Sequence, residues 1–202
     1  MYSIKETSIG KAWVALVNLV QTEGTQLADE GMEITNVTVQ FDHDSNQPDQ
    51  ILEEFADKDM IQNMQFVFFG RGEDRLGHSY KDLMMGPLGE NDFSDVVALL
   101  KNKEECKRAT VTFCHKGEGK VPCINVVNFL SRNEELQVSY FARGQDAYKK
   151  FFADAVAVAE MQALVAKEVG LQVGTITGFI ASAHNYFDDA EKYNVLIDVS
   201  EQ

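Results

Sequence analysis

The sequence predicts a single α+β domain over residues 1–202, built on a mixed sheet that is packed by helices. Its length of 202 residues fits one domain with a sizeable core, and no Pro/Gly/Ser-rich linker divides it. Helical patterns over 8–23 and 146–169 stand apart from three consecutive strand patterns between 109 and 142 that are separated only by turns. We therefore expect a sheet of about five or six strands that contains an antiparallel meander.

The first half of the chain contains two clear patterns and two weaker ones. The residues from Ser8 to Glu23 carry apolar side chains at helical spacing and are followed by Gly24, which predicts a core helix. The segment 31–41 alternates apolar and polar residues and predicts a strand with one wet face. After a turn at 42–48, we expect a short helix over 49–55 and a buried strand over 65–69, where the residues are mostly apolar.

The second half predicts the meander and the main helix. We expect an amphipathic helix over 92–100, an exposed turn over 101–107, and three strands whose ranges are 109–114, 123–130 and 136–142. A long buried helix over 146–169 is capped by Gly170, and a last strand covers 171–180. If that strand continues, His184 and Tyr186 lie on one face of it.

Composition and charge exclude several classes of function. The net charge of -14 argues against nucleic acid or an anionic membrane as the main partner, because like charges repel. No apolar run reaches the roughly 18 residues of a spanning helix. Three cysteines in dissimilar contexts suit free thiols in a reducing cytoplasm. Cys114-His115 has no second Cys/His pair beside it, so we expect no metal site. Gly70-Arg71-Gly72 opens no helix and is a poor phosphate loop.

A set of chemically versatile residues recurs through the second half of the chain. Cys123 follows a proline, and the later residues of the set follow it at intervals of 20, 3, 8, 30 and 2 positions: Arg143, Asp146, Asp154, His184 and Tyr186. This order and spacing resemble the thymidylate synthase family, which includes the deoxycytidylate and cytidylate hydroxymethylases. The resemblance is specific from about residue 105 to residue 190 and weak before that.

The resemblance implies a fold, a reaction and a set of roles. It implies a thymidylate synthase-like fold that dimerises through its sheet, with a pyrimidine nucleotide as substrate and 5,10-methylenetetrahydrofolate as cofactor. In the family, Cys123 corresponds to the nucleophile and Arg143 to the arginine that contacts both the phosphate and the cysteine. Asp146 belongs to the same catalytic motif. Further substrate contacts are implied for His184 and Tyr186 at the sugar hydroxyl, for Asn128 on the cysteine strand, and for Lys107 and Arg108, which would come from the other subunit of the dimer.

Asp154 stands at the base-reading position of the family. Uracil offers an acceptor at O4 and a donor at N3, which an asparagine matches, whereas cytosine offers the reverse pattern. A protonated carboxyl group gives to N3 and accepts from N4, and in the family an aspartate here accompanies cytosine nucleotides. The sequence therefore predicts a (d)CMP 5-hydroxymethyltransferase. A solvated carboxylate on an exposed helix face is the alternative reading of Asp154.

Several departures from the family pattern keep other functions open. The segment 26–30, where the family has a phosphate-binding arginine, contains no basic residue, and the chain lacks the family's longer C-terminal tail. Family residues near the cysteine, after the arginine and before the histidine are replaced by Ile124, Gly144 and Ser182. Glu53 and Glu54 are candidates for a proton-transfer role, with a solvated helix face as the alternative. A thymidylate synthase acting on dUMP, and a catalytically inactive member that binds a nucleotide or a protein, are the competing hypotheses.

Overall fold

The computed structural model describes residues 1–28, 30–43, 47–70, 79–89, 92–103, 105–113 and 121–200. In chain order its elements are β1 Tyr2–Glu6, α1 Ile9–Glu23, β2 Thr25–Leu27, β3 Gly31–Phe41, α2 Gln50–Phe55, α3 Lys58–Phe69, α4 Tyr80–Leu83, β4 Met84–Met85, α5 Ser94–Asn102, β5 Thr110–Phe113, β6 Ile124–Arg132, β7 Glu135–Ala142, β8 Gln145–Asp146, α6 Phe151–Val169, β9 Gln172–Tyr186, a 3-10 turn at Phe187–Asp189, and α7 Ala190–Ser200. This is the expected α+β architecture. None of the helices in the described ranges has the length and apolar character needed to cross a membrane.

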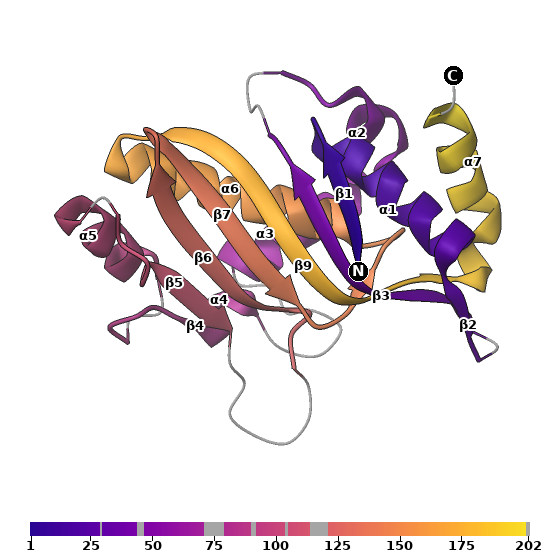
Figure 1. Ribbon diagram of the computed structural model, residues 1–202, viewed down its shortest axis with the longest axis horizontal. Coiled ribbons are helices and arrows are strands. Elements are labelled where there is room, and N and C mark those ends of the chain that lie inside the picture. Colours follow the sequence, from indigo (N-terminus) through magenta and orange to yellow (C-terminus); the bar gives the residue numbers. More distant parts are fainter. Residues whose placement is uncertain are drawn as a thin grey trace.

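One mixed sheet organises the molecule (Figure 1). Its described strands follow the order β1-β3-β9-β7-β6-β5-β4, while β2 pairs with β3 and β8 pairs with β9. The predicted meander is present as the antiparallel run β5-β6-β7. The long strand β9 lies at the centre, antiparallel to β3 and parallel to β7. The nine described strands exceed the five or six expected, because short strands such as β1, β4 and β8 carry too few residues to show a pattern.

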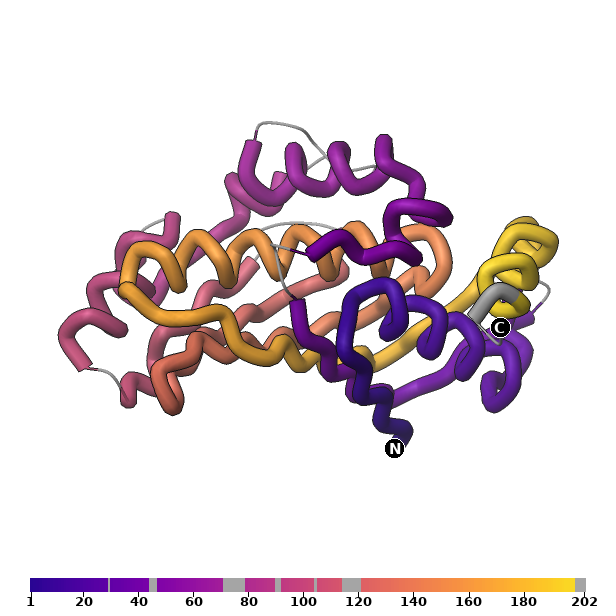
Figure 2. The backbone as a smooth tube through the Cα atoms, turned by 90° about the horizontal axis from the view of Figure 1, so that it is seen from above, coloured from indigo at the N-terminus to yellow at the C-terminus, as the bar shows by residue number. Residues whose placement is uncertain are grey.

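The helices pack mainly against one face of this sheet. Helix α6 lies between the sheet and α3, so this part of the molecule has three layers (Figure 2). Helix α6 begins with the large buried side chains Phe151 and Phe152 and continues with mostly small ones, and Gly170 ends it in the left-handed conformation with φ 77°. Helix α1 begins at its capping residue Ser8, whose hydroxyl accepts from the backbone N–H of Lys11, and it buries Trp13 against α6.

The predicted strand over 65–69 is wrong, because these residues form the second half of helix α3. The side chain of Asp57 caps that helix by accepting from two backbone N–H groups, and Met64, Val67 and Phe68 then fall on one buried face. A short apolar run fits either a strand or a helix, so it did not distinguish them. The segment 71–78 after Gly70, and Cys114 with His115, lie outside the described residues.

Other boundaries moved by a few residues or by a whole turn. The helix expected from 146 begins at Phe151, since Gln145 and Asp146 form the short strand β8 and a turn follows. The helix expected over 92–100 runs from Ser94 to Asn102 and takes up the start of the predicted turn. Strand β9 continues six residues past 180 to Tyr186, which satisfies the condition for pairing His184 and Tyr186 on one face.

Candidate active site

Six of the predicted site residues come together at one end of the sheet. Cys123 lies just before β6, Arg143 just after β7, and Asp146 on the short strand β8. Asp154 lies in the first turn of α6, and His184 and Tyr186 lie at the end of β9. Strands β6 and β7 are antiparallel, with Ile124 opposite Ala142, so the residue before one strand meets the residue after the other. Spacing along the chain and proximity in space therefore agree for this group.

Arg143 holds the segment that carries Cys123. Its backbone N–H donates to the carbonyl of Cys123 over 2.9 Å. Its guanidinium Nε donates to the carbonyls of Val121 and Pro122 over 2.8 and 3.0 Å, and Nη2 also donates to Val121. The Arg143 side chain is exposed and a guanidinium carries more N–H donors than these bonds use, so it can also bind an anion. Cys123 is half-buried and is not part of a disulfide.

A row of three titratable side chains crosses the sheet beside this loop. His184 of β9 is directly opposite Asp146 of β8 on one side and Glu33 of β3 on the other. Burial raises the pKa of Asp146 and lowers the pKa of His184, and the charges of Asp146 and Glu33 partly oppose the shift of the His184 pKa. Glu33 also accepts a hydrogen bond of 2.6 Å from the hydroxyl of Ser182. The imidazole thus lies between two carboxylates.

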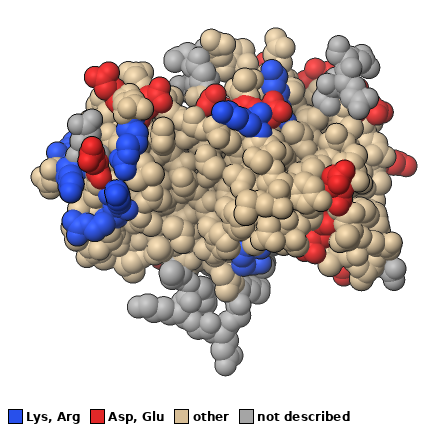
Figure 3. Space-filling view, in the orientation of Figure 1, with Lys and Arg blue, Asp and Glu red and all other residues tan. Residues whose placement is uncertain are grey.

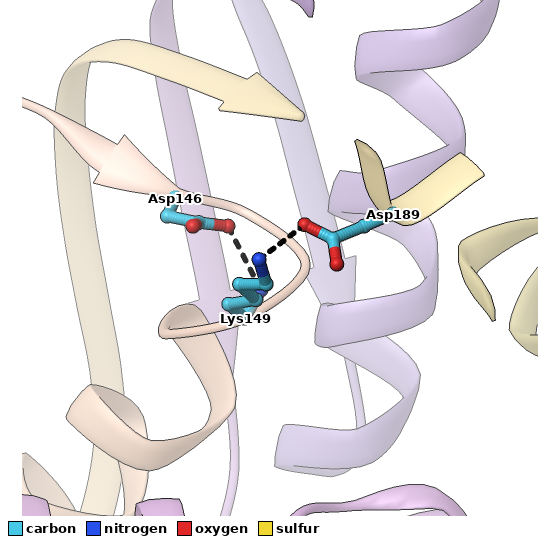
Figure 4. A network of polar contacts seen from close by, with 3 residues as sticks. All are labelled: Asp146, Lys149 and Asp189. Carbon is cyan, nitrogen blue, oxygen red and sulfur yellow. Dashed lines mark hydrogen bonds and ion pairs between the residues drawn. The ribbon is translucent and has the colours of Figure 1, made fainter. Parts of the chain in front are cut away.

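The turn from β8 into α6 is held by a lysine (Figure 4). The backbone N–H of Lys149 donates to Asp146 Oδ1 over 2.8 Å, and its ammonium group forms an ion pair of 2.6 Å with Asp189. The carboxylate of Asp189 is buried, so this ion pair ties the turn to the segment that leads into α7. The hydrogen bond from the Lys149 backbone N–H to Asp146 lies in the turn that this ion pair holds.

Tyr186 completes the open side of the site. Its ring packs edge-on against the imidazole of His184, with 5.0 Å between the ring centroids. Burial raises the pKa of the phenol, and the charges of Asp146, Glu30 and Cys123 add to that increase. Tyr186 therefore lies within electrostatic reach of the cysteine, although 63 residues separate them in the sequence.

Asp154 is a buried carboxyl group, which rules out the alternative of an exposed helix carboxylate. Its side chain is 3% exposed, and Oδ2 accepts a hydrogen bond of 2.8 Å from Nε2 of Gln145, which is itself 1% exposed. Burial raises the pKa of the neighbouring Tyr140, and the charge of Asp154 adds to the increase. A carboxyl group with an amide partner in a water-poor environment is suited to selective hydrogen bonding.

Three predicted substrate contacts lie elsewhere in the single chain. Asn128 is five residues along from Cys123, roughly 16 Å at the usual rise of a strand, and its amide donates to Thr110 Oγ1 over 2.7 Å. Lys107 and Arg108 are exposed and precede β5. Figure 3 shows Lys and Arg side chains gathered over the α5 and β5 end of the molecule. Within one chain these residues do not join the site.

Glu33, Gln145, Lys149 and Asp189 were missed by sequence reasoning. Each belongs to the site through a partner that is distant in sequence or on a neighbouring strand, and none is itself one of the residues that define the family motif. The position of Gln145 between Arg143 and Asp146 was the one available signal. Glu53 and Glu54, by contrast, are exposed on α2, as the solvated-face alternative predicted.

A cavity of about 350 Å³ adjoins the Asp146 turn. Four aromatic side chains line it together with charged groups, and the lining includes Trp13, Phe55, Tyr148, Phe152, Asp57, Lys149, Asp189 and Lys192. The indole N–H of Trp13 donates to the carbonyl of Tyr148 over 2.9 Å, which holds this aromatic wall in place. Among the described residues, no cluster of three or more His, Cys, Asp or Glu side chains is arranged to hold a metal ion.

Comparison with known proteins gives one family. The thymidylate synthase profile matches residues 17–201. A protein of Methanothermobacter thermautotrophicus with the name "Putative thymidylate synthase" is 28% identical over 216 residues, which cover 95% of this chain and 97% of the relative. A protein of the same name from Methanocaldococcus jannaschii is 24% identical, with 96% of each chain covered. Since the profile spans the chain from within α1 to the last residues of the sequence, the protein belongs to the thymidylate synthase family.

Proposed function

We propose that the protein is a pyrimidine nucleotide C5 one-carbon transferase, and that it hydroxymethylates a cytidine nucleotide, dCMP or CMP. One observation carries the choice of base: the carboxyl group of Asp154 is buried at the end of the sheet where Cys123 and Arg143 meet. Membership of the thymidylate synthase family supports the reaction class. The family acts on pyrimidine nucleotides and generally uses 5,10-methylenetetrahydrofolate.

In this proposal Cys123 is the nucleophile. The pyrimidine C5 atom is a poor nucleophile until a group adds at C6. The Cys123 thiolate forms an S–C6 bond, and the electron pair of the C5–C6 double bond moves to C5 and makes it nucleophilic. C5 then forms a bond to the transferred CH2 group and loses its proton, and the carrier of that group leaves with its electron pair, which makes an exocyclic methylene. Water adds to this methylene to give the hydroxymethyl group, the C5–C6 double bond re-forms, and the S–C6 bond breaks to restore the thiolate. The guanidinium of Arg143, bound to the carbonyls on either side of Pro122, orients the cysteine and favours its thiolate form.

Asp154 selects the base in this proposal. The protonated carboxyl donates to cytosine N3 and accepts from the N4 amine, whereas uracil presents N3–H and O4 in the opposite sense. A buried group that faces the wrong pattern is left without a hydrogen bond, so a mismatch is costly. The low exposure of Asp154 supports this, because bulk water cannot replace the missing partner.

In this proposal the sugar and the phosphate of the nucleotide bind on the solvent-exposed side of the site. His184 and Tyr186 share a face of β9 and offer an imidazole and a phenol for a sugar hydroxyl. Arg143 binds the phosphate from within the chain. Lys107 and Arg108 bind it from a second subunit, because in one chain they precede Ala109, whose carbonyl accepts from Phe129, six residues along β6 from Cys123.

The proposed homodimer forms through the sheet face that faces the viewer in Figures 1 and 3, where few charged side chains appear. Phe141 and Phe179 stack on each other in neighbouring strands, with 5.9 Å between their ring centroids, and Phe141 is 38% exposed. Burying such aromatic area between two subunits is favourable. The proposal includes a cytoplasmic location, where Cys123 stays reduced.

The cavity beside the Asp146 turn fits a flat heteroaromatic cofactor with an acidic tail. Trp13, Tyr148 and Phe152 offer aromatic walls, and Lys192 offers a cation, while Lys149 is already paired with Asp189. When bound, 5,10-methylenetetrahydrofolate supplies the carbon that C5 acquires. The carboxyl of Asp146, three residues before Lys149 of this lining, has its pKa raised by burial and is the group that we assign to proton transfer.

One observation favours the alternative of an inactive nucleotide-binding or protein-binding member. The segment 26–30 has no cation, and Glu30 adds negative charge near Tyr186. A phosphate would therefore meet carboxylates there unless Arg143 and the second subunit compensate for them.

A tritium-release assay at C5 separates these functions. The protein is incubated with C5-tritiated dCMP, CMP or dUMP, with and without methylenetetrahydrofolate. We expect release from a cytidine nucleotide and little from dUMP. Faster release from dUMP would identify a thymidylate synthase, and no release from any nucleotide that nevertheless binds would identify the inactive member.

A further inference from the structure

Gln145 and Asp154 form a direct link between two buried polar side chains. Gln145 lies on β8 opposite Ala183 of β9, and this face of the sheet is covered by α6. Asp154 lies in the first turn of α6. The hydrogen bond of 2.8 Å between Gln145 Nε2 and Asp154 Oδ2 joins the strand to the helix, with 1% and 3% of the two residues exposed.

Burying the polar side chain of Gln145 costs free energy, because only part of its amide group is hydrogen-bonded to described residues. Within the described part of the chain, Gln145 Oε1 is buried and has no hydrogen-bond partner. An apolar side chain of similar length would fill the same space without leaving an acceptor unsatisfied. What glutamine adds over such a side chain is a neutral N–H donor directed at Asp154.

We propose that Gln145 is a positioning residue that makes Asp154 a reader of cytosine. The inference rests on the function proposed above and names how the base is recognised. Because Oδ2 accepts from the amide, it takes the carbonyl-like form, and a proton on the carboxyl group is carried by Oδ1. Oδ1 then donates to N3 of cytosine, and a second lone pair of Oδ2 accepts from the N4 amine. An amide donor thereby fixes which carboxyl oxygen meets which atom of the base.

The titratable groups around Asp154 leave this arrangement intact at neutral pH. Tyr140 on β7 faces Asp154, and its raised pKa keeps the phenol neutral through the physiological range. Burial raises the pKa of Asp146 and lowers the pKa of His184, but these two residues are opposite each other on the other face of β8 and β9. Any pH dependence of base recognition should therefore follow the carboxyl group of Asp154 and the ring of the base.

The chain contains a matched control for Gln145. Gln162 is fully buried in the middle of α6, its Nε2 donates to the carbonyls of Leu136 and Gly174 over 2.7 Å each, and its Oε1 also has no partner among the described residues. Both glutamine side chains are buried, and in each the amide nitrogen donates a hydrogen bond while the amide oxygen has no partner among the described residues. They differ in their acceptors, which are backbone carbonyls for Gln162 and a titratable side chain for Gln145.

The test measures binding of dCMP and dUMP by calorimetry from pH 5.5 to 8.5 for the wild type and for Gln145→Met, Gln145→Glu and Gln162→Met. Gln145→Met should lower the preference for dCMP about fivefold, the equivalent of one ordinary hydrogen bond. Loss of the donor favours the protonated carboxyl, so the pH profile of dCMP binding should move to higher pH. Gln162→Met should lower the melting temperature and leave the preference unchanged.

Gln145→Glu distinguishes donation from packing. A protonated glutamic acid donates to Asp154 as the amide does, whereas an ionised one repels it. The preference for dCMP should therefore be restored at pH 5.5 and lost at pH 8.5. If this variant keeps a constant preference across the range, or if Gln145→Met folds and keeps the wild-type ratio, the inference is overturned.

The outcome is separable from the function on which it rests. Asp154→Asn is measured in parallel. If Asp154→Asn changes the ratio of dCMP to dUMP and the Gln145 variants do not, Gln145 is a packing residue and the proposed function stands. If Asp154→Asn leaves the ratio unchanged, the proposed base recognition itself fails.

Discussion

The two faces of strand β8 are built for different kinds of recognition. On the helix-covered face Gln145 holds the buried carboxyl of Asp154 through a neutral amide. On the other face His184 of β9 lies between Asp146 of β8 and Glu33 of β3, so that two carboxylates act on one imidazole across three strands. The consecutive residues Gln145 and Asp146 thus belong to two halves of the site. The water-poor half around Gln145 and Asp154 is called the dry half, and the more exposed half around Asp146, His184 and Glu33 is called the open half. The dry half is suited to discriminating hydrogen-bond patterns, and the open half to holding a polar sugar and moving protons.

The largest effect on activity is expected from Cys123, at the strand ends where the two halves meet. Replacing Cys123 by Ser should reduce tritium release at C5 by at least roughly a thousandfold, since removing a nucleophile has cost an enzyme about a millionfold. Cys106→Ser is the matched control, because Cys106 is buried before β5 and outside the group at the end of the sheet. Equal release by the Cys123 variant and the wild type would remove the nucleophile from the proposal.

The next effect tests how tightly the dry half is packed. At Gly178 a methyl group would lie 2.2 Å from the ring of buried Tyr140, which is in turn a neighbour of Asp154. Gly178→Ala should therefore destabilise the protein by roughly 1–3 kcal/mol, the usual cost of overpacking. Gly144→Ala is the control, because no described atom lies within 4 Å of the added methyl group. Urea unfolding measures both, and equal midpoints would show that Tyr140 can move aside.

The comparison of the two faces also predicts a change in specificity. Asp154→Asn should move binding toward uracil, because an amide offers a donor to O4 and an acceptor to N3–H. A hydrogen bond to a charged group contributes about 1.5–3 kcal/mol, so the ratio of dCMP to dUMP affinity should fall at least tenfold. Calorimetry with both nucleotides measures this ratio. An equal ratio in wild type and variant from pH 6 to 8 would mean that Asp154 does not contact the base.

The smallest effect is a pH dependence that belongs to the open half. The pKa of His184 is lowered in the folded protein, so the neutral imidazole is favoured and its contribution to stability is complete above about pH 6.5. That contribution is lost as the pH falls from 6.5 through the lowered pKa. The raised pKa of Asp146 acts in the opposite sense at lower pH, because protonation removes the cost of burying its charge.

Urea unfolding of wild type and His184→Gln at pH 7.5 and 5.0 isolates the histidine. The wild type should lose more stability than the variant between these values. Glu33→Gln should enlarge the loss, because the carboxylate raises the pKa of His184. Identical pH slopes in the wild type and His184→Gln would contradict the assigned environment of the imidazole.

Local pattern was sufficient for the long elements and for the set of residues that carries the chemistry. The strand Gly31–Phe41 was predicted at its observed limits, and the helix predicted over 8–23 is observed as Ile9–Glu23 with Ser8 as its cap, since alternation and helical spacing are properties of consecutive residues. The spacing from Cys123 to Tyr186 pointed to the thymidylate synthase family, and the family profile confirms it. The roles of these residues in binding and catalysis stay predictions.

Tertiary structure alone decided the partners. Glu33 meets His184 only because β3 pairs with β9 in one register, across a separation of 151 residues, and a shift by one residue would turn every side chain to the other face. Gln145 meets Asp154 because a two-residue strand, too short to carry a pattern, lies under the first turn of α6. The run at 65–69 became a helix because Asp57 capped it and α6 offered its apolar face a surface to pack on. In each case the energy that decides comes from contacts between segments far apart in the chain, which no window of neighbouring residues contains.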